Sequence, residues 1–437
     1  MNLTIIGTGY VGLTTGACLA NLGHEVLCFD TDHSKIDLLK KGTIPFYEPA
    51  LPELVQSNTD QGRLRYTTDP VESILFGEVI FNCVGTPEQH HGAADLRSVF
   101  MVVDMVAEHA SRYKVLVNKS TVPPGTARAC QDRVRNKNHL VPIEIVSNPE
   151  FLKQGNAVHD FNHPDKIVLG SSSPKALAEM KKVYFGLVRT YLPVLETTWE
   201  TAEMIKYANN SFLAAKISFI NEIANICQRT GADIKIVAKA LGMDYRIGPK
   251  FLNAGIGYGG SCFPKDIRAL AHLAQEQGYD AALLREIDHA NERQKYIFLP
   301  TILESLKTRS GNTVTIWGLS FKPKTNDVRG APAISLITRL LSEGLTIKVY
   351  DPLAIPEARL VLGEKVIYCN SIVDSVQGSN LIVLITEWDE FRNVNFAELG
   401  KQMKSKIICD GRNIYDPQLL QEAGFEYYGI GQGKAKP

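Results

Sequence analysis

Cys262 lies in a glycine-rich stretch, residues 255–266 with the sequence GIGYGGSCFPKD, directly before an expected helix start at Pro264. Partial positive charge at a helix N-terminus, together with the nearby Lys265, favours the thiolate form of a cysteine. The glycines of the stretch leave room for a ligand to approach. The pattern therefore predicts a nucleophilic cysteine, and a buried cysteine with a structural role is the alternative.

Two further pairs of polar residues have helical spacing. Lys206 and Asn210 are four residues apart in an expected long helix, so they share one face and could bind a developing oxyanion or hold a water molecule. A solvated stripe on that helix is the alternative. Glu150 and Gln154 have the same spacing beyond an expected strand end, where a carboxylate could orient water. A glutamate at a helix N-terminus explains the second pair equally well.

A glycine turn near the N-terminus predicts a dinucleotide site. Residues 7–12, GTGYVG, follow a short apolar strand and open a helix whose N-terminus can face a phosphate. In this pattern Gly7 makes the tight turn, Gly9 allows close approach of the pyrophosphate, and Gly12 allows close packing of helix on strand.

Asp30 ends the next expected strand, eighteen residues after Gly12. A carboxylate there accepts hydrogen bonds from ribose hydroxyls and repels a 2′-phosphate. No arginine follows Asp30 closely, so NAD is favoured over NADP. A helix cap or a turn residue is the alternative for Asp30.

Two loops after strands, residues 84–87 and 120–126, lie on the same side of the expected sheet. They offer the hydroxyls of Thr86 and Thr121, and proline restrains their backbone, near the expected place of a nicotinamide ribose. Loops of this composition are ordinary turns more often than binding sites, so each is weak evidence by itself.

The elements that must position these residues follow a repeated strand and helix alternation. Short apolar runs predict strands at residues 3–6, 26–29, 79–84, 115–118 and 143–146, and later at 314–317, 346–350, 381–385 and 406–409. The stretches between them have helical length, which predicts parallel sheets covered by helices on both faces. Asp351 ends the second strand of the later group, as Asp30 does in the first.

The middle of the chain is expected to be helical. Thr197 with Glu200 forms a possible capping box, and apolar residues at helical spacing continue to Gly231. Further helices are predicted at residues 234–241, 264–277 and 333–342. The fold class is therefore α/β, with two doubly wound Rossmann-like domains joined by a long central helix. The predicted boundaries are 1–196, 197–300 and 301–437, with ligands at the carboxyl ends of the strands, facing the cleft between the two domains.

Composition excludes several classes of protein. A length of 437 residues allows two or three domains, and 44% apolar with 22% charged residues is ordinary for a globular protein. Basic and acidic residues number 47 each, so no general attraction to nucleic acid or to an anionic membrane is expected. No apolar run predicts a membrane helix, and the apolar N-terminus lacks the early basic residues of a signal peptide. Eight scattered cysteines predict reduced thiols in a cytoplasm and no metal site.

These motifs resemble, in order and spacing, those of the nucleotide-sugar dehydrogenases, the UDP-glucose/GDP-mannose dehydrogenase family, over nearly the whole chain. The segments that carry the resemblance are residues 7–12, 147–152 (SNPEFL), 202–210 (AEMIKYANN), 257–266 and 321–323 (FKP). The cysteine segment is the most specific of them. Arg246-Ile247-Gly248 ahead of Phe251-Leu252-Asn253-Ala254-Gly255 favours the UDP-glucose branch over the GDP-mannose and UDP-N-acetylmannosamine branches.

The resemblance implies two successive NAD-dependent oxidations of the sugar C6 alcohol of UDP-glucose, to the aldehyde and then to the acid. It makes Cys262 the nucleophile, Lys206 the group that stabilises the oxyanion, and Asn210 a residue that places water. It gives the remaining catalytic positions to Asp266, Glu150 and Thr121. A thiohemiacetal and then a thioester on Cys262 would carry the second oxidation, because hydride leaves a tetrahedral adduct more easily than an aldehyde.

The same resemblance implies the binding residues. NAD would contact Gly7, Gly9, Tyr10, Val11, Gly12, Asp30, Lys35, Thr86, Thr121, Gln154, Lys265 and Arg329. The substrate would contact Glu150, Phe151, Leu152, Lys153, Gln154, Lys206, Asn210, Arg246, Phe251, Leu252, Asn253, Ala254, Gly255, Gly259 and Lys322. Arg246 reaches a neighbouring subunit's site in such enzymes, so a homodimer or higher homo-oligomer built around the long helix is expected.

The sequence departs from the family pattern at Gln154, where a glutamate is usual. An amide cannot take a proton, so a base role there is lost and falls to Glu150, Asp266 or a bound water. Asn326 and Gly330 also differ from the common residues, in a loop on the NAD side. Two other interpretations keep the fold: a dehydrogenase that performs one oxidation without using Cys262, and a silent sensor of NAD or of a nucleotide sugar.

Overall fold

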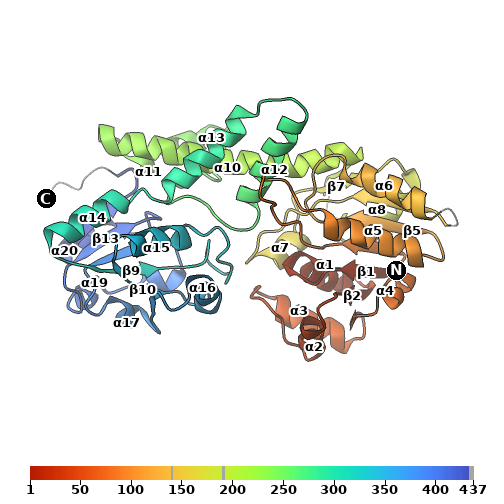
Figure 1. Ribbon diagram of the computed structural model, residues 1–437, viewed down its shortest axis with the longest axis horizontal. Coiled ribbons are helices and arrows are strands. Elements are labelled where there is room, and N and C mark those ends of the chain that lie inside the picture. Colours follow the sequence, from red (N-terminus) through yellow and green to blue (C-terminus); the bar gives the residue numbers. More distant parts are fainter. Residues whose placement is uncertain (139–140, 189–191, 433–437) are drawn as a thin grey trace. The chain divides into compact units, whose positions relative to one another are not determined.

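The computed structural model describes residues 1–138, 141–188 and 192–432 (Figure 1). The chain divides into two compact units, Met1–Asn209 with His272–Tyr279, and Asn210–Ala271 with Asp280–Pro437. Each unit contains its own sheet and its own buried apolar core.

The first unit is built on an eight-stranded sheet, within the described residues, of order β3-β2-β1-β4-β5-β6-β7-β8. Its strands are β1 (Asn2–Ile6), β2 (Glu25–Phe29), β3 (Leu64–Thr67), β4 (Val79–Asn82), β5 (Lys114–Asn118), β6 (Ile143–Ser147), β7 (Ile167–Gly170) and β8 (Val194–Thr197). The strands from β3 to β6 are parallel, as expected, whereas β7 runs antiparallel to β6. The expectation of a wholly parallel sheet is therefore wrong at β7.

Helices cover both faces of this sheet. Those of the first unit are α1 (Tyr10–Asn21), α2 (His33–Lys40), α3 (Leu51–Asp60), α4 (Pro70–Phe76), α5 (Arg97–His109), α6 (Thr126–Lys137), α7 (Ala157–Asn162), α8 (Pro174–Val183) and α9 (Phe185–Val188). One apolar core joins α1, α3, α7 and α8 to the sheet, and another joins α4, α5 and α6 to it. Strands covered on both faces are buried along their length, and all five residues of β5 are buried, the polar Lys114 and Asn118 included.

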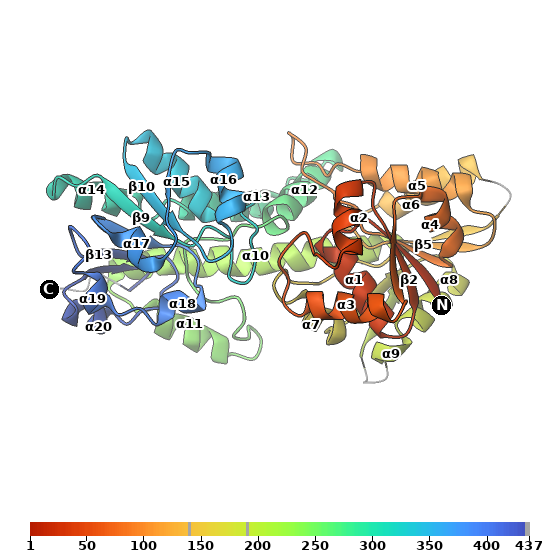
Figure 2. The ribbon, with the colours of Figure 1, turned by 90° about the horizontal axis from the view of Figure 1, so that it is seen from below.

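The second unit has a six-stranded sheet, within the described residues, of order β11-β10-β9-β12-β13-β14, and all its pairings are parallel. Its strands are β9 (Thr313–Trp317), β10 (Thr346–Tyr350), β11 (Ile367–Tyr368), β12 (Leu381–Leu384), β13 (Ile407–Asp410) and β14 (Glu426–Gly429). Figure 2 shows α14 and α15 on one side of this sheet and α18 to α20 on the other. The same strand and helix plan therefore occurs twice in the chain.

The remaining helices lie between the sheets in sequence or within the second unit. They are α10 (Trp199–Thr230), α11 (Ile234–Met243), α12 (Phe263–Glu276), α13 (Ala282–Gln294), α14 (Leu299–Thr308), α15 (Pro332–Ser342), α16 (Ile355–Leu362), α17 (Ile372–Val376), α18 (Asp389–Arg392), α19 (Phe396–Leu399) and α20 (Pro417–Glu422). α10 has 32 residues, and its residues are divided between the two units after Asn209.

The expected long helix is confirmed, but its expected cap is wrong. Thr198, not Thr197, accepts a hydrogen bond at its side chain, from Thr201 N over 3.3 Å. Glu200 pairs with Arg128 over 2.8 Å instead of closing a capping box. Among the described residues, no helix combines the length and the hydropathy that crossing a membrane requires.

The predicted α/β class, with two Rossmann-like sheets and a long helix in the middle of the chain, is confirmed. Each strand predicted from an apolar run is present within two residues of its expected ends. The predictions missed β3, β7, β8, β11 and β14, and also α13 and α14. Several of these strands are short and partly exposed at or near a sheet edge, so they lack a continuous apolar run.

Candidate active site

The glycine turn between β1 and α1 has the geometry that its three glycines require. Gly7 has φ +93°, which favours glycine, and its N–H donates to Phe29 O over 2.8 Å. A Cβ on Gly12 would collide with Gly7 O, so the helix packs on the turn through bare backbone. A Cβ on Gly9 would meet no protein atom within 4 Å. The turn therefore leaves its open side at Gly9, where Tyr10 and Val11 begin α1.

Asp30 lies directly after β2 and is tied to the glycine turn. Its Oδ2 accepts hydrogen bonds from Thr8 N and Thr8 Oγ1, each over 2.8 Å, and from Lys35 Nζ over 3.0 Å. Burial favours the neutral acid, but the bonds from Thr8, Asp32 and Lys35 outweigh it and hold the pKa of Asp30 below its usual value. The carboxylate is therefore ionised and held at the turn, as the expected contact with a ribose would require.

The two hydroxyl-bearing loops lie side by side after β4 and β5. Thr86 Oγ1 donates to Thr121 O over 2.9 Å, and Ser120 Oγ donates to Val84 O over 2.6 Å. The structure thus joins both loops at the carboxyl edge of the sheet that also carries the glycine turn, where α/β sheets bind their ligands.

Glu150 and Lys206 form a buried ion pair in the first unit. Both side chains are 5% exposed, and Lys206 Nζ lies 3.1 Å from Glu150 Oε1. Leu152 N donates to the other carboxylate oxygen, and the Phe151 ring lies 5.2 Å from Lys206 Nζ. Lys206 is therefore not part of a solvated stripe. The pair joins the loop after β6 to α10.

The rest of that loop is less enclosed. Lys153 is exposed and pairs with Asp160 over 3.2 Å, and Gln154 lies partly exposed in the following turn. Glu48 accepts hydrogen bonds from Gly155 N and Ala157 N, each over 2.7 Å, and so holds the start of α7. The loop that carries Glu150 is thus fixed at both ends, while Gln154 remains available at its surface.

Asn210 and Asp266 meet in the second unit. Asp266, in the first turn of α12, is 1% exposed and accepts hydrogen bonds from Asn210 Nδ2 and Lys265 Nζ, each over 2.6 Å. Lys206 and Asn210 are one turn apart on α10, so this helix carries one member of each pair. Asp266 is thereby a charged anchor for the amide of Asn210.

Cys262 differs from the other cysteines of the chain. All eight are free thiols within the described residues, and seven are buried, whereas Cys262 is partly exposed. It directly precedes α12, and its carbonyl accepts the hydrogen bond from Asp266 N over 2.9 Å, within the first turn. This position at a helix N-terminus is the one that favours a thiolate.

The glycines before Cys262 have a packing role that the sequence did not predict. A Cβ on Gly259 would collide with Gly330 O, and a Cβ on Gly260 would press into the Phe321 ring. A Cβ on Gly255 would lie 3.0 Å from Gly411 O. These glycines allow the segment to pack against loops at the strand ends of the second unit. That they also leave room for a ligand stays a prediction.

The other predicted substrate residues of the second unit are spread along the connection from α11 to α12. Leu252 and Ala254 are buried, Asn253 is exposed, and Phe251 has φ +64°. Arg246 is exposed and pairs with Asp244 over 2.6 Å. Their role as substrate contacts stays a prediction.

Lys322 and Arg329 lie in the loop between β9 and α15. Lys322 Nζ is 5.5 Å from the Phe321 ring, and the exposed Arg329 pairs with Asp327 over 2.6 Å. Arg329 O accepts the N–H of Gly260 over 2.8 Å. This loop therefore supports the cysteine segment directly, whatever ligand it contacts.

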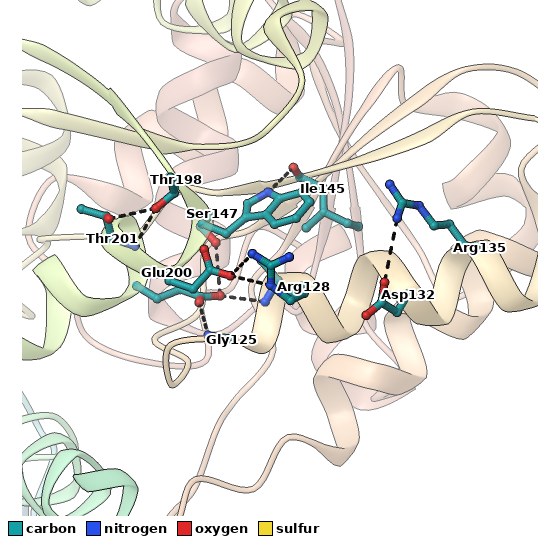
Figure 3. Close-up of polar contacts among 12 residues, drawn as sticks. Gly125, Arg128, Asp132, Arg135, Ile145, Ser147, Thr198, Glu200 and Thr201 are labelled. Atoms are coloured by element: carbon teal, nitrogen blue, oxygen red, sulfur yellow. Dashed lines mark hydrogen bonds and ion pairs between the residues drawn. The ribbon is translucent and has the colours of Figure 1, made fainter. Parts of the chain in front are cut away.

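No local pattern in the sequence assigns a role to Glu203, a buried carboxylate one turn before Lys206 on α10. It accepts hydrogen bonds from Gly125 N over 2.7 Å and Ala127 N over 2.8 Å, at the start of α6, and from Ser147 Oγ. Figure 3 shows this contact region, with Gly125 and Ser147 beside Glu200 and Arg128. Burial raises the pKa of Glu203 to about 7 despite these donors. Its partners are more than 50 residues away in sequence, so no local pattern reveals them.

The fold and the arrangement of these side chains define the class of protein. A doubly wound sheet with an open glycine turn, and an ionised aspartate after the second strand, is a dinucleotide-binding unit. A partly exposed cysteine at a helix start, and a buried lysine and asparagine on one helix that each contact a buried carboxylate, add the chemistry of an oxidoreductase.

Comparison with known proteins identifies the family. Residues 1–188 match the NAD binding domain of the UDP-glucose/GDP-mannose dehydrogenase family, residues 200–293 its central domain and residues 315–417 its UDP binding domain. The chain belongs to this family. The expected NAD cofactor and the expected family are thereby confirmed, and the three predicted domain boundaries remain predictions.

Individual relatives resemble the chain over its full length. It is 44% identical over 431 residues to UDP-glucose 6-dehydrogenase TuaD of Bacillus subtilis, covering 98% of this chain and 93% of that protein. It is 41% identical to a UDP-glucose 6-dehydrogenase of Pseudomonas aeruginosa, covering 100% and 98% of the two chains. Its fold matches that of a UDP-glucose dehydrogenase from Pyrobaculum islandicum with a TM-score of 0.90 at 33% identity, covering 99% and 98%. A UDP-D-ManNAc dehydrogenase from Pyrococcus horikoshii matches with a TM-score of 0.88 at 27% identity, covering 99% of each chain.

Replacing Asp30 by alanine is expected to weaken NAD binding about 10- to 100-fold, because a hydrogen bond to a charged group contributes about 1.5 to 3 kcal/mol. Isothermal titration with NAD measures the effect. Asp32→Ala is the control, since Asp32 caps α2 nearby and is exposed. Equal dissociation constants for Asp30→Ala and the wild type would remove Asp30 from the cofactor site.

Glu203 is expected to make stability depend on pH. Its folded pKa of about 7 lies above the ordinary 4.5, so the unfolded chain releases this proton first as the pH rises. Its contribution to the free energy of unfolding therefore falls between about pH 4.5 and pH 7, by about 3 kcal/mol in total, and is constant above. Urea denaturation at pH 5 and pH 8 measures it, and Glu203→Gln should abolish this part of the difference. Glu200→Gln is the control, and an unchanged difference in Glu203→Gln would contradict the assignment.

Proposed function

We propose that this chain catalyses the NAD-dependent oxidation of the C6 alcohol of UDP-glucose to UDP-glucuronate, in two steps. The substrate is supported by full-length identity of 40–44% to several UDP-glucose 6-dehydrogenases. The two-step course is supported by one observation above the others: Cys262 is the partly exposed cysteine among eight, and it stands at the N-terminus of α12.

The first unit holds the cofactor in this proposal. The open side of Gly9 and the N-terminus of α1 receive the pyrophosphate, and Asp30 binds the adenosine ribose with Lys35 beside it. Thr86, Thr121, Gln154, Lys265 and Arg329 are the further proposed contacts. When bound, NAD accepts one hydride from C6 in each of the two oxidations.

Lys206 and Glu150 act on the oxygen of C6. Oxidation of the alcohol removes a hydride from carbon and a proton from the hydroxyl, so a base must take the proton. Glu150 and Asp266 are the proposed bases, and the ammonium of Lys206 stabilises the negative charge that develops on the oxygen. Both members of the Glu150–Lys206 pair are buried, which strengthens that electrostatic effect.

Cys262 carries the second oxidation. Its thiolate adds to the aldehyde carbon, and the oxyanion that forms takes up a proton to give a thiohemiacetal. The thiohemiacetal loses its C6 hydride to NAD and its hydroxyl proton to one of the proposed bases, which leaves a thioester. Asn210, whose amide is held by Asp266, places a water molecule that attacks the thioester carbonyl. The C–S bond breaks, one proton of the water goes to the sulfur and the other to a base, and the product leaves as a carboxylate. Gln154 cannot act as the base of this hydrolysis, because an amide does not accept the proton.

The remaining substrate contacts follow the family pattern. Residues 315–417 match the family's UDP binding domain, so we place the uridine diphosphate on the second unit, with Lys322 as a phosphate contact. The other proposed contacts are Phe151, Leu152, Lys153, Arg246, Phe251, Leu252, Asn253, Ala254, Gly255 and Gly259. We place the reaction in the cytoplasm, where eight free thiols remain reduced.

The count of NADH per sugar tests this function. Purified protein with NAD and UDP-glucose is expected to release two NADH per sugar consumed. Cys262→Ser should lose UDP-glucuronate formation, because a serine hydroxyl is a much weaker nucleophile than a thiolate. Cys369→Ser, at a buried cysteine of the second unit, is the control and should keep the count.

The alternative outcomes separate the rival interpretations. One NADH per sugar would indicate a single oxidation without the thioester, and NAD binding without any NADH would indicate a sensor. Turnover of UDP-N-acetylmannosamine or GDP-mannose in place of UDP-glucose would assign the chain to another branch of the family. The similarity to the UDP-D-ManNAc dehydrogenase structure from Pyrococcus horikoshii is the reason to test the first of these sugars. UDP-glucuronate release at the wild-type rate by Cys262→Ser would contradict the role of the thiol.

A second copy of the chain is the proposed partner of α10. Phe212, Phe219 and Ile226 lie seven residues apart on this helix, and each is at least half exposed. A seven-residue apolar repeat presents one face suited to packing against another helix. Arg246, exposed beyond α11, is then available to a neighbouring subunit.

The mass of the protein in solution tests this partner. Phe212→Glu with Phe219→Glu is expected to convert a dimer or larger oligomer to monomers, because charges on the shared face would be buried without partners. Sedimentation velocity measures the mass. Leu360→Glu, at an exposed leucine of α16, is the control and should leave it unchanged. A wild-type monomer at micromolar concentration would contradict the proposal.

A further inference from the structure

Lys119 is a buried lysine for which the reaction described above has no use. It directly follows β5 and is 6% exposed. Its backbone N–H donates to Asn82 O over 3.0 Å, which places it at the carboxyl ends of β4 and β5. It therefore lies at the same sheet edge as the loops that carry Thr86 and Thr121.

The hydrogen-bond partners of the Lys119 ammonium are neutral. Lys119 Nζ donates to Asn148 Oδ1 over 3.2 Å and to Tyr184 Oη over 3.4 Å. Tyr184 Oη also donates to Asn148 Oδ1, over 2.6 Å, and burial raises the pKa of this phenol, so it stays neutral. Neutral partners satisfy the donors of an ammonium but do not balance its charge.

The charge that balances Lys119 is Glu150. Burial is the chief reason that the pKa of Lys119 is lowered, to about 8; attraction to Glu150 opposes this effect, and repulsion by Lys206 adds to it. Cys83 also acts on Lys119 from the end of β4, but burial raises the pKa of this thiol and keeps it neutral, as it does for Tyr184 after α8. Glu150 is thus in direct contact with one buried cation, Lys206, and attracts a second, Lys119.

The same contacts fix the backbone that carries Glu150. Asn148 is two residues before Glu150, its N–H donates to Asn118 O over 2.9 Å, and its Nδ2 donates to Val168 O over 2.9 Å. Asn148 is therefore anchored to β5 and β7, and Lys119 and Tyr184 hold its remaining oxygen.

We propose that Lys119 is a positioning residue for the reaction: its ammonium holds Asn148 and thereby fixes Glu150 against Lys206, and its positive charge attracts the Glu150 carboxylate. For its kinetic part this inference rests on the proposed function. Lys119 does not touch the reacting atoms in this proposal. It acts through Glu150, which must be charged both to hold Lys206 and to serve as a base.

Removal of the Lys119 charge tests the proposal through the pH profile. In Lys119→Met and Lys119→Gln the acidic limb of the kcat profile is expected to move upward by about one pH unit, because an attractive charge is lost near a carboxylate. On that limb kcat falls about ten-fold, since one pH unit changes the ionised fraction by that factor. The dissociation constants for NAD and UDP-glucose should stay within about two-fold of the wild-type values, because Lys119 binds neither ligand. Lys119→Arg keeps the charge and should restore the position of the limb.

Lys114 provides a matched control at the other end of the same strand. It is also buried, and burial lowers its pKa to about 8, but its ammonium donates to the carbonyls of Leu75 and Gly77. Lys114→Met removes an equally buried charge and should leave the acidic limb in place even where it lowers stability. A shift in Lys114→Met as large as that in Lys119→Met would overturn the proposal, and so would superimposable profiles of Lys119→Met and the wild type.

A measurement independent of activity separates this inference from the proposed function. The side-chain carboxyl 13C signal of Glu150, assigned by its loss in Glu150→Gln, changes with pH as the group titrates. In Lys119→Met and Lys119→Gln this change is expected at higher pH than in the wild type, whether or not UDP-glucose is the substrate. An unchanged titration of this signal overturns the inference, whereas a wild type that reduces no NAD with UDP-glucose overturns only the function.

Discussion

A buried ionised group needs an opposite charge or several hydrogen-bond donors, and this requirement determines where the polar side chains of both units lie. Glu150 and Lys206 satisfy it by direct pairing, and Asp266 satisfies it with Lys265 and Asn210. Glu203 satisfies it only in part, through backbone N–H groups at the start of α6, and burial raises its pKa to about 7. Apart from Lys265, which lies beside Asp266 on α12, each partner comes from a different element, so each of these groups also connects two parts of the fold.

Both Rossmann-like sheets have a glycine turn with an aspartate after the second strand, but the two aspartates have different surroundings. Gly318 and Asp351 occupy in the second unit the places of Gly7 and Asp30, and Gly318 N donates to Tyr350 O over 2.9 Å as Gly7 N does to Phe29 O. Asp351 is buried, however, and its oxygens accept hydrogen bonds from Leu319 N over 2.7 Å and from Trp388 Nε1 over 3.1 Å.

The second turn also lacks the helix that a phosphate would meet. After Gly318 the next helix of the described chain, α15, begins only at Pro332, whereas α1 begins three residues after Gly7. The second copy of the plan thus buries its aspartate, whereas Asp30 is partly exposed, and it offers no helix N-terminus at the turn. This difference agrees with a family match to an NAD binding domain in the first unit and to a UDP binding domain in the second.

Features that depend on neighbours in sequence could be predicted, and features that depend on distant partners could not. The glycine turn, the strand ends and the helical face of Lys206 and Asn210 are local patterns, and the structure contains all three. Lys119 meets Asn148 and Tyr184 at separations of 29 and 65 residues, and nothing near it in sequence indicates that it is buried. The close packing of the glycines before Cys262 against Gly330 and Phe321 is likewise invisible in the sequence, because these neighbours come from a distant loop. The residues hardest to predict are therefore those that hold the proposed reacting groups in position without touching the substrate, because their partners come from distant parts of the sequence and meet them only through tertiary packing.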